Sequence, residues 1–95
     1  MDLEFRGELW YWRGPAPFHF LSLPVEVTAG LRAMSALVSY GWGMIPVTAR
    51  IGTSEWTTAL FLKDGRYVLP VKDAVRRAQG LAIGDDVATR VSVRH

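Results

Sequence analysis

Aromatic residues are the first side chains in this sequence with a chemical signature, and most of them lie in the N-terminal half. The run Trp-Tyr-Trp at positions 10–12 would place rings on both faces of a single strand. Large rigid rings with a polar tip are typical of ligand pockets and interfaces, although the same rings can also fill the interior of a small barrel. We expect an apolar groove that takes a flat or acidic ligand. Its expected walls are Trp12, Phe18 and Trp42, and its expected rim is Arg13 and Arg50.

Basic side chains supply the second signature. Lys72, Arg76 and Arg77 share the polar side of a short predicted helix, where Lys72 and Arg76 are four residues apart. Arginine outnumbers lysine by nine to two in the chain, which suits planar, bidentate contacts to carboxylate or phosphate. These three residues are the first candidates for contact with an anion or a partner, although Asp73 reduces their charge. The alternative is a solvated surface held by ordinary salt bridges.

Groups able to catalyse a reaction are scarce. The chain has no cysteine and only two histidines, His19 and His95, so thiolate chemistry and a histidine-rich zinc centre are excluded. His19 stands between two phenylalanines with no evident triad partner, and no serine has a nucleophile-elbow pattern. Asp85 and Asp86 fit a turn better than a calcium loop. The sequence therefore predicts a protein that is not an enzyme and has no metal or cofactor.

Length and charge limit the remaining function classes. Ninety-five residues suffice for one core, so residues 1–95 are expected to form a single domain. The net charge is +2, and no run of like charges exceeds Arg76-Arg77, so nucleic-acid binding is possible but disfavoured. No segment approaches the roughly 20 apolar residues of a membrane span. We expect a cytoplasmic monomer or weak homodimer whose ligand is an unidentified small molecule or protein.

Hydrophobic periodicity indicates the elements that must position these residues. Two-residue alternation and β-forming composition predict strands, and a stripe with helical spacing predicts helices, each opened by a proline. Gly30 is expected to weaken the first helix, and Pro46 to mark a strand edge or bulge. Asp64-Gly65 predicts a hairpin turn. The expected strands are 3–12, 18–23, 44–51, 56–62, 67–69 and 87–93, and the expected helices are 24–39 and 70–80.

The order of these elements repeats along the chain. Two half-units, about 1–51 and 52–95, each read as strand, strand, Leu-Pro-Val, helix, glycine turn and strand. Residues 47–51 match 87–91, and 5–10 can be laid loosely on 56–61. Halves too small to close a core alone can close one together. The pattern predicts a pseudo-two-fold β-barrel with Arg50 and Arg90 in related places, and chance similarity of short motifs is the alternative.

The segment from Leu69 to Val87 resembles the core of AbrB-type transition-state regulators and MazE-type antitoxins. The resemblance rests on its order of Pro, Arg, Gly-Leu and Gly-Asp. The whole chain is similar to a bacterial family catalogued only as a domain of unknown function. That similarity rests on the aromatic opening, the segment 18–24 and the blocks 51–61, 64–67 and 69–87. It implies a double-split β-barrel, mainly β with two short helices, and no assigned activity.

The regulators differ from this chain in charge. They are swapped dimers whose basic N-terminal arms bind DNA, whereas the N-terminal half here is neutral and carries Glu4 and Glu8. A shared fold does not carry its function with it. The leading expectation is therefore a small binding or interaction domain. The alternative is a nucleic-acid-binding transcriptional regulator or antitoxin-like module.

Overall fold

The computed structural model describes residues 2–15, 17–38 and 43–94, with side chains throughout except at positions 35–38. This part of the chain holds six strands and two helices, and none of its helices is long and apolar enough to cross a lipid bilayer. In chain order the elements are β1 (Asp2–Trp12), β2 (Phe18–Ser22), α1 (Val25–Val38), β3 (Ile45–Ile51), β4 (Ser54–Lys63), β5 (Arg66–Val71), α2 (Asp73–Ala78) and β6 (Asp86–Val93).

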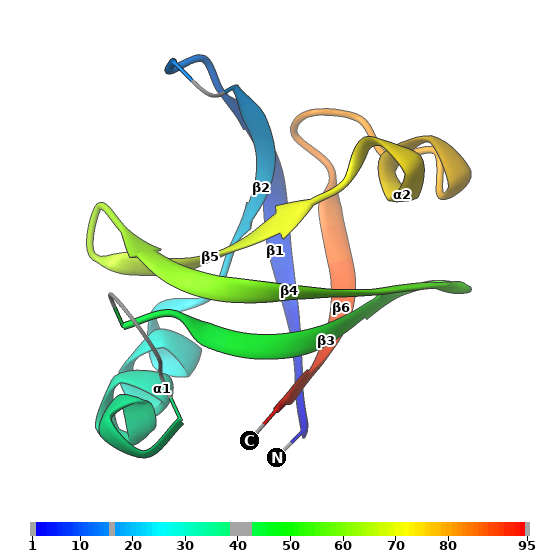
Figure 1. Ribbon diagram of the computed structural model, residues 1–95. Coiled ribbons are helices and arrows are strands. Elements are labelled where there is room, and N and C mark those ends of the chain that lie inside the picture. Colours follow the sequence, from blue (N-terminus) through cyan, green and yellow to red (C-terminus); the bar gives the residue numbers. More distant parts are fainter. Residues whose placement is uncertain (1, 16, 39–42, 95) are drawn as a thin grey trace.

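The six strands close into one antiparallel barrel with the order β1-β2-β5-β4-β3-β6. Figure 1 shows α1 at one end of the barrel and α2 at the other, with the start of β1 beside the end of β6. The prediction of a mainly β fold with two short helices is confirmed.

Two-residue alternation decides what each strand buries. In β1, Phe5 and Leu9 are buried, whereas Glu4 and Arg6 are exposed. In β6, the same rule buries every second residue from Val87 to Val93. Successive side chains of a strand point to opposite faces, so the apolar set of each strand meets the others inside the barrel.

Two proline predictions are wrong. Pro70 does not open a helix: it lies within β5 opposite Phe20, and α2 begins at Asp73. The β4–β5 pairing ends at Val68, so no ladder bond needs the N–H that Pro70 lacks. Pro46 does not mark a free edge, because β3 lies between β4 and β6 and the Pro46 carbonyl accepts a hydrogen bond from the Arg94 N–H at 2.8 Å.

Helix α1 is also more regular than expected. It runs from Val25 to Val38 without a break at Gly30. Pro24 precedes the helix, and its carbonyl accepts the first helical bond from the Thr28 N–H at 2.9 Å. Inward packing of Leu31, which is almost fully buried, outweighs the weak helix propensity of the glycine.

The strand order does not change when the two halves of the chain are exchanged. Swapping β1 with β4, β2 with β5 and β3 with β6 keeps every pair of neighbours. The registers of two ladders agree as well. Phe5 pairs with Thr89, and Trp56, which aligns with Phe5 in the sequence repeat, pairs with Ala49, which aligns with Thr89.

The two Leu-Pro-Val motifs do not coincide when the halves are exchanged. The strand pairing places them two residues apart. Trp10 pairs with Phe20, and Phe61, which aligns with Trp10, pairs with Val68. The pairing therefore equates Phe20 with Val68 and Leu21 with Leu69, whereas the motif equates Leu23 with Leu69. The two Leu-Pro-Val segments therefore do not occupy equivalent register positions in the barrel.

The β1–β2 hairpin extends past the end of the barrel. β1 pairs with β6 only as far as Glu8, whereas its ladder with β2 continues to Trp12 opposite Phe18. Figure 1 shows this end of the hairpin and α2 on the same side of the barrel. The space between them is where the chemically distinctive side chains meet.

Candidate ligand-binding cleft

A cleft of about 660 Å³ lies between the projecting hairpin and α2, and we call it the hairpin–helix cleft. The pairing of His19 with Val71 fixes β2 beside β5, and the chain passes directly from Val71 through Lys72 into α2. The first turn of α2 is therefore held beside the hairpin. The residues that line the cleft are Tyr11, Arg13, Pro17, Phe18, His19, Lys72, Asp73, Arg76 and Ile83.

The walls of the cleft contain exposed apolar side chains. Tyr11, Phe18 and Ile83 are 37%, 38% and 61% exposed. They are three of the five large hydrophobic residues that are exposed in the described ranges of the chain. Apolar side chains that gather around a hollow mark a place where a ligand can displace water.

The cleft carries an excess of positive charge. Arg13, Lys72 and Arg76 line it, against the single carboxylate of Asp73. The Asp73 Oδ1 atom lies 3.6 Å from Arg76 Nε and 3.7 Å from His19 Nδ1. Within the part of the chain that the structure describes, Arg13 and Lys72 form no ion pair. These two cations therefore face the cleft without a neutralising partner.

Arg76 is the most constrained of the three cations. Its main chain is fixed by the helix, since its N–H donates to the Lys72 carbonyl at 3.0 Å and its own carbonyl accepts from the Leu81 N–H at 2.9 Å. The Nε atom is buried and finds no hydrogen-bond acceptor among the described residues, and the 3.6 Å to Asp73 is too long for one. A buried donor left unbonded costs about 1–3 kcal/mol. The Arg76 side chain as a whole is 28% exposed, so a ligand in the cleft can reach its exposed atoms but not the buried Nε.

Sequence reasoning missed five residues of the cleft, namely Tyr11, Pro17, His19, Asp73 and Ile83. The His19 side chain is only 12% exposed, and its ring lies 4.7 Å from that of Tyr11. The available signal was alternation. Tyr11 follows the inward-facing Leu9 by two residues, so its side chain had to point toward the barrel axis and past the barrel end.

Two further predicted site residues that the structure describes, Trp12 and Arg77, do not line the cleft. Trp12 is on the opposite face of β1 from Tyr11, with Lys63 Nζ 4.0 Å from its ring centroid. Trp42 lies outside the described residues. Arg77 is exposed on α2 and does not line the cleft. Of the two predicted wall residues that the structure describes, Phe18 lines the cleft and Trp12 does not.

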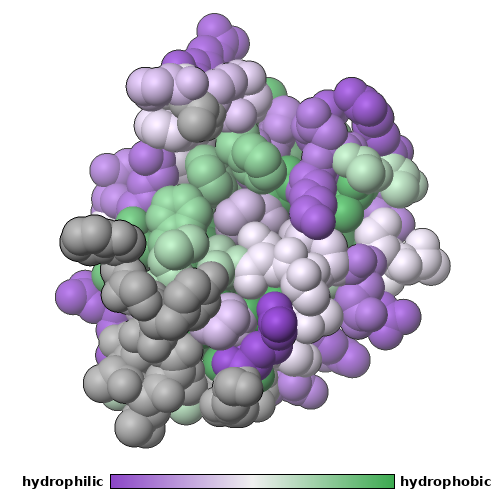
Figure 2. All heavy atoms as spheres, in the orientation of Figure 1, coloured by the Kyte–Doolittle hydropathy of each residue, from purple (hydrophilic) through white to green (hydrophobic). Residues whose placement is uncertain are grey.

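Aromatic rings do gather on the outside of the sheet formed by β2, β5 and β4, and Figure 2 shows an apolar patch there. The Phe20 ring lies 5.3 Å from Trp10, 5.8 Å from Phe18 and 5.6 Å from Phe61. Such tilted and edge-on contacts stabilise ring pairs. Phe20 is only 5% exposed, so much of this cluster is packing, and Phe18 connects it to the cleft.

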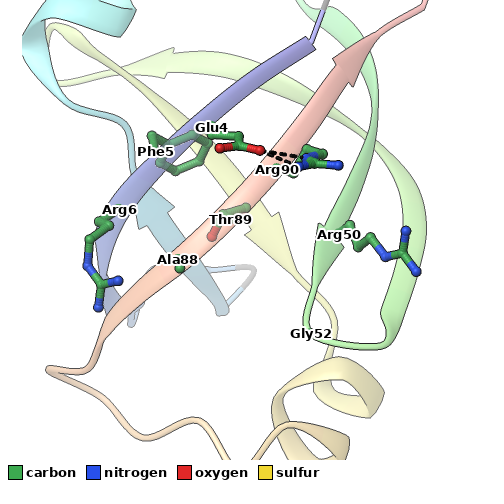
Figure 3. Close-up of a pocket in the computed structure, with 8 residues that line it drawn as sticks. All are labelled: Glu4, Phe5, Arg6, Arg50, Gly52, Ala88, Thr89 and Arg90. Atoms are coloured by element: carbon green, nitrogen blue, oxygen red, sulfur yellow. Dashed lines mark hydrogen bonds and ion pairs between the residues drawn. The ribbon is translucent and has the colours of Figure 1, made fainter.

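Arg50 belongs to a second hollow, so its predicted place beside Phe18 is wrong. This hollow, of about 480 Å³, lies where β3 and β6 separate beyond the pair Arg50–Arg90. Glu4 binds Arg90, whose Nε lies 3.0 Å from Glu4 Oε1, whereas Arg50 forms no ion pair with any residue that the structure describes. Figure 3 shows Arg50 apart from that pair. Arg50 and Arg90 are direct cross-strand neighbours in the β3–β6 ladder.

Metal binding has no support among the residues described. No three of their His, Asp or Glu side chains form a group that could hold an ion. The cleft contains one such carboxylate and one imidazole, flanked by three cations. Its chemistry favours the binding of an anion.

Comparison with known proteins agrees with the sequence resemblance at the level of the family. A search of the curated proteins finds no match. A family model described as "Domain of unknown function (DUF1905)" matches residues 5–91, which contain all six barrel strands in whole or in large part and every residue that lines the hairpin–helix cleft. The chain therefore belongs to the DUF1905 family.

Proposed function

We propose that this domain is a binding module that holds an anion with a flat apolar part in the hairpin–helix cleft. The observation that carries the proposal is Arg76, a cation held on a short helix whose side chain lines the cleft and is 28% exposed. Arg13 and Lys72 add charge around it, and Tyr11 and Phe18 offer exposed rings. A carboxylate or phosphate satisfies the cations, while a flat group covers the rings.

The same residues favour binding over catalysis. Among the described residues that line the cleft there is no serine, threonine or cysteine, and the histidine lies 3.7 Å from a carboxylate that also faces Arg76. A general base needs a reacting group within hydrogen-bond reach, and a nucleophile needs a base beside it. We therefore propose a non-enzymatic domain, acting as a monomer or a weak dimer in the cytoplasm.

Replacing Arg76 separates this proposal from ordinary surface charge. We expect 2-naphthoate to bind the wild-type domain, and Arg76→Ala to weaken it by about 10- to 100-fold, because a hydrogen bond to a charged group contributes about 1.5–3 kcal/mol. Two-dimensional NMR titration of backbone amides measures both the affinity and the location.

Arg77→Ala is the matched control, since it removes the same charge from the next residue of α2 without touching the cleft. It should leave the affinity within about twofold of wild type. Neutral 2-naphthamide should bind much more weakly than the carboxylate. Equal losses in both variants, or equal binding of the two compounds, would show that the cleft is not an anion site.

Nucleic-acid binding by an AbrB-like or MazE-like module is the second candidate. Two observations favour it. The strand order stays the same when the two halves of the chain are exchanged, and Arg50 pairs with Arg90 across neighbouring strands. The neighbouring charges oppose it, because Glu4 binds Arg90 and Asp86 binds Arg6 at 2.7 Å on the same face. Few arginines on this face remain to neutralise phosphates.

We therefore expect only nonspecific duplex affinity, with a Kd of about 10⁻⁴–10⁻⁶ M at physiological salt. Fluorescence anisotropy with a labelled mixed-sequence duplex, repeated over a salt series, measures the affinity and the number of phosphate contacts. Submicromolar binding with a steep salt dependence would place the nucleic-acid function first.

A further inference from the structure

The main chain of β1 has a free edge inside the hairpin–helix cleft. Leu9 marks the last contact of β1 with the chain leading into β6: its N–H donates to the Asp85 carbonyl at 2.9 Å, and its carbonyl accepts from the Gly84 N–H at 2.8 Å. Hydrogen-bonding direction alternates along a strand, so Tyr11 points its N–H and C=O the same way, away from β2. The register with β2 is continuous from Leu9 to Trp12, so no bulge interrupts this alternation.

The chain beside this edge turns away before it can pair with Tyr11. Gly84 has a positive φ of 95°, and the Asp85 N–H bonds to the Ala82 carbonyl at 3.0 Å, which closes a turn toward α2. Tyr11 and Ile83 both line the cleft. Among the described residues, no main-chain hydrogen bond joins Tyr11 to the turn at 82–85.

We propose that an extended, acidic segment of a partner polypeptide occupies this edge and adds a short strand to β1. This inference rests on the proposed function of the cleft as an anion site and names its ligand class. One residue of the segment exchanges two main-chain hydrogen bonds with Tyr11, in the antiparallel sense of the β1–β6 pair.

The geometry also determines where the acidic side chain sits. A residue directly opposite Tyr11 in an antiparallel pair points its side chain to the same face as Tyr11. Tyr11, His19 and the first turn of α2 share that side, where Lys72 and Arg76 line the cleft. The paired residue is therefore an aspartate or a glutamate. Its two neighbours point to the other face, where apolar or small side chains suit the rings on the outside of the hairpin.

The test uses a blocked five-residue peptide, acetyl-Thr-Val-Glu-Val-Thr-amide, and the same peptide methylated on the main-chain nitrogen of its glutamate. Methylation removes the N–H that would donate to the Tyr11 carbonyl but leaves the carboxylate. We expect the parent peptide to bind and the methylated peptide to bind about tenfold more weakly. A peptide with glutamine in place of glutamate should lose binding to a similar or greater extent.

Two variants of the protein probe the other hydrogen bond. Tyr11→Pro removes both the ring and the outward N–H, whereas Tyr11→Ala removes the ring alone. Proline is tolerated here because the N–H of Tyr11 makes no ladder bond with β2. We expect the proline variant to bind the parent peptide about five- to tenfold more weakly than the alanine variant. If the proline variant does not fold, as judged by circular dichroism, the methylated peptide still decides the matter.

The outcomes separate this inference from the proposed function. Equal binding of the parent and methylated peptides, or binding of 2-naphthoate without binding of either peptide, overturns strand addition and leaves the anion site standing. Failure of the peptides and of 2-naphthoate together overturns both. Weaker binding of the methylated peptide, confined by NMR to residues of the cleft, supports strand addition.

Discussion

Gly7→Ala should lower the free energy of unfolding by about 3 kcal/mol or more, the upper end of the usual effect of overpacking. Gly7 is buried in β1, and a Cβ atom there would lie 2.5 Å from the main-chain carbonyl oxygen of Ser22 in β2. A carbonyl in a barrel strand cannot swing aside as the tip of a side chain can. The close approach of β1 and β2 therefore requires glycine at this position. Urea unfolding followed by circular dichroism measures the change.

Gly30→Ala is the matched control and should have the opposite sign. Gly30 is exposed within α1, and a Cβ atom there meets no atom of the described chain within 4 Å. Alanine favours the helix by about 0.5–1 kcal/mol over glycine. A Gly7→Ala protein as stable as wild type would show that β1 and β2 lie further apart than the structure places them.

Trp56→Ala should lower the free energy of unfolding by about 3–5 kcal/mol, as expected when a buried indole is removed. Trp56 is only 7% exposed, and its Nε1 donates to the Pro70 carbonyl at 3.2 Å. That bond joins β4 to β5 beyond Val68, where their main-chain pairing has ended. Because small domains are stable by only about 5–15 kcal/mol, this loss removes a large part of the total.

Trp56→Phe separates the two contributions of the indole. Phenylalanine keeps most of the apolar volume and loses the hydrogen bond, so we expect a loss of about 1–2 kcal/mol. Urea unfolding of both variants, with slopes equal to that of wild type, gives the comparison. Equal losses in the two variants would contradict a role for cavity formation at this site.

Local patterns predicted the secondary structure well wherever one strand or turn contains its own signal. The alternation of β1 recurs in its burial, since Phe5 and Leu9 face inward. Asp64 and Gly65 both have a positive φ, 53° and 80°, as the two-residue hairpin turn requires. The predicted helix start was wrong where a proline was interpreted without its strand neighbours. Pro70 opens no helix, because the end of the β4–β5 ladder lets it remain in a strand.

The candidate site was predictable only as separate pieces. Phe18, Arg13, Lys72 and Arg76 were each recognised from residue type and spacing, but Phe18 and Arg13 were assigned to one group and Lys72 and Arg76 to another. The pairing of His19 with Val71 joins them, since it brings the start of α2 beside the hairpin. Strand pairing also explains why Arg50 does not line the cleft. Arg50 pairs with Arg90 of β6 and lies away from the β1–β2 hairpin.

Short-range chemistry in the chain was enough to specify strands, helices, turns and the kinds of side chain able to hold an anion. These features depend on neighbours a few residues apart, and their periodicities are visible in the letters. Which cations meet which rings depended on strand order and register, which join residues as distant as Arg13 and Arg76. Barrel closure sets those pairings through the packing of all six strands at once, so no single segment encodes them.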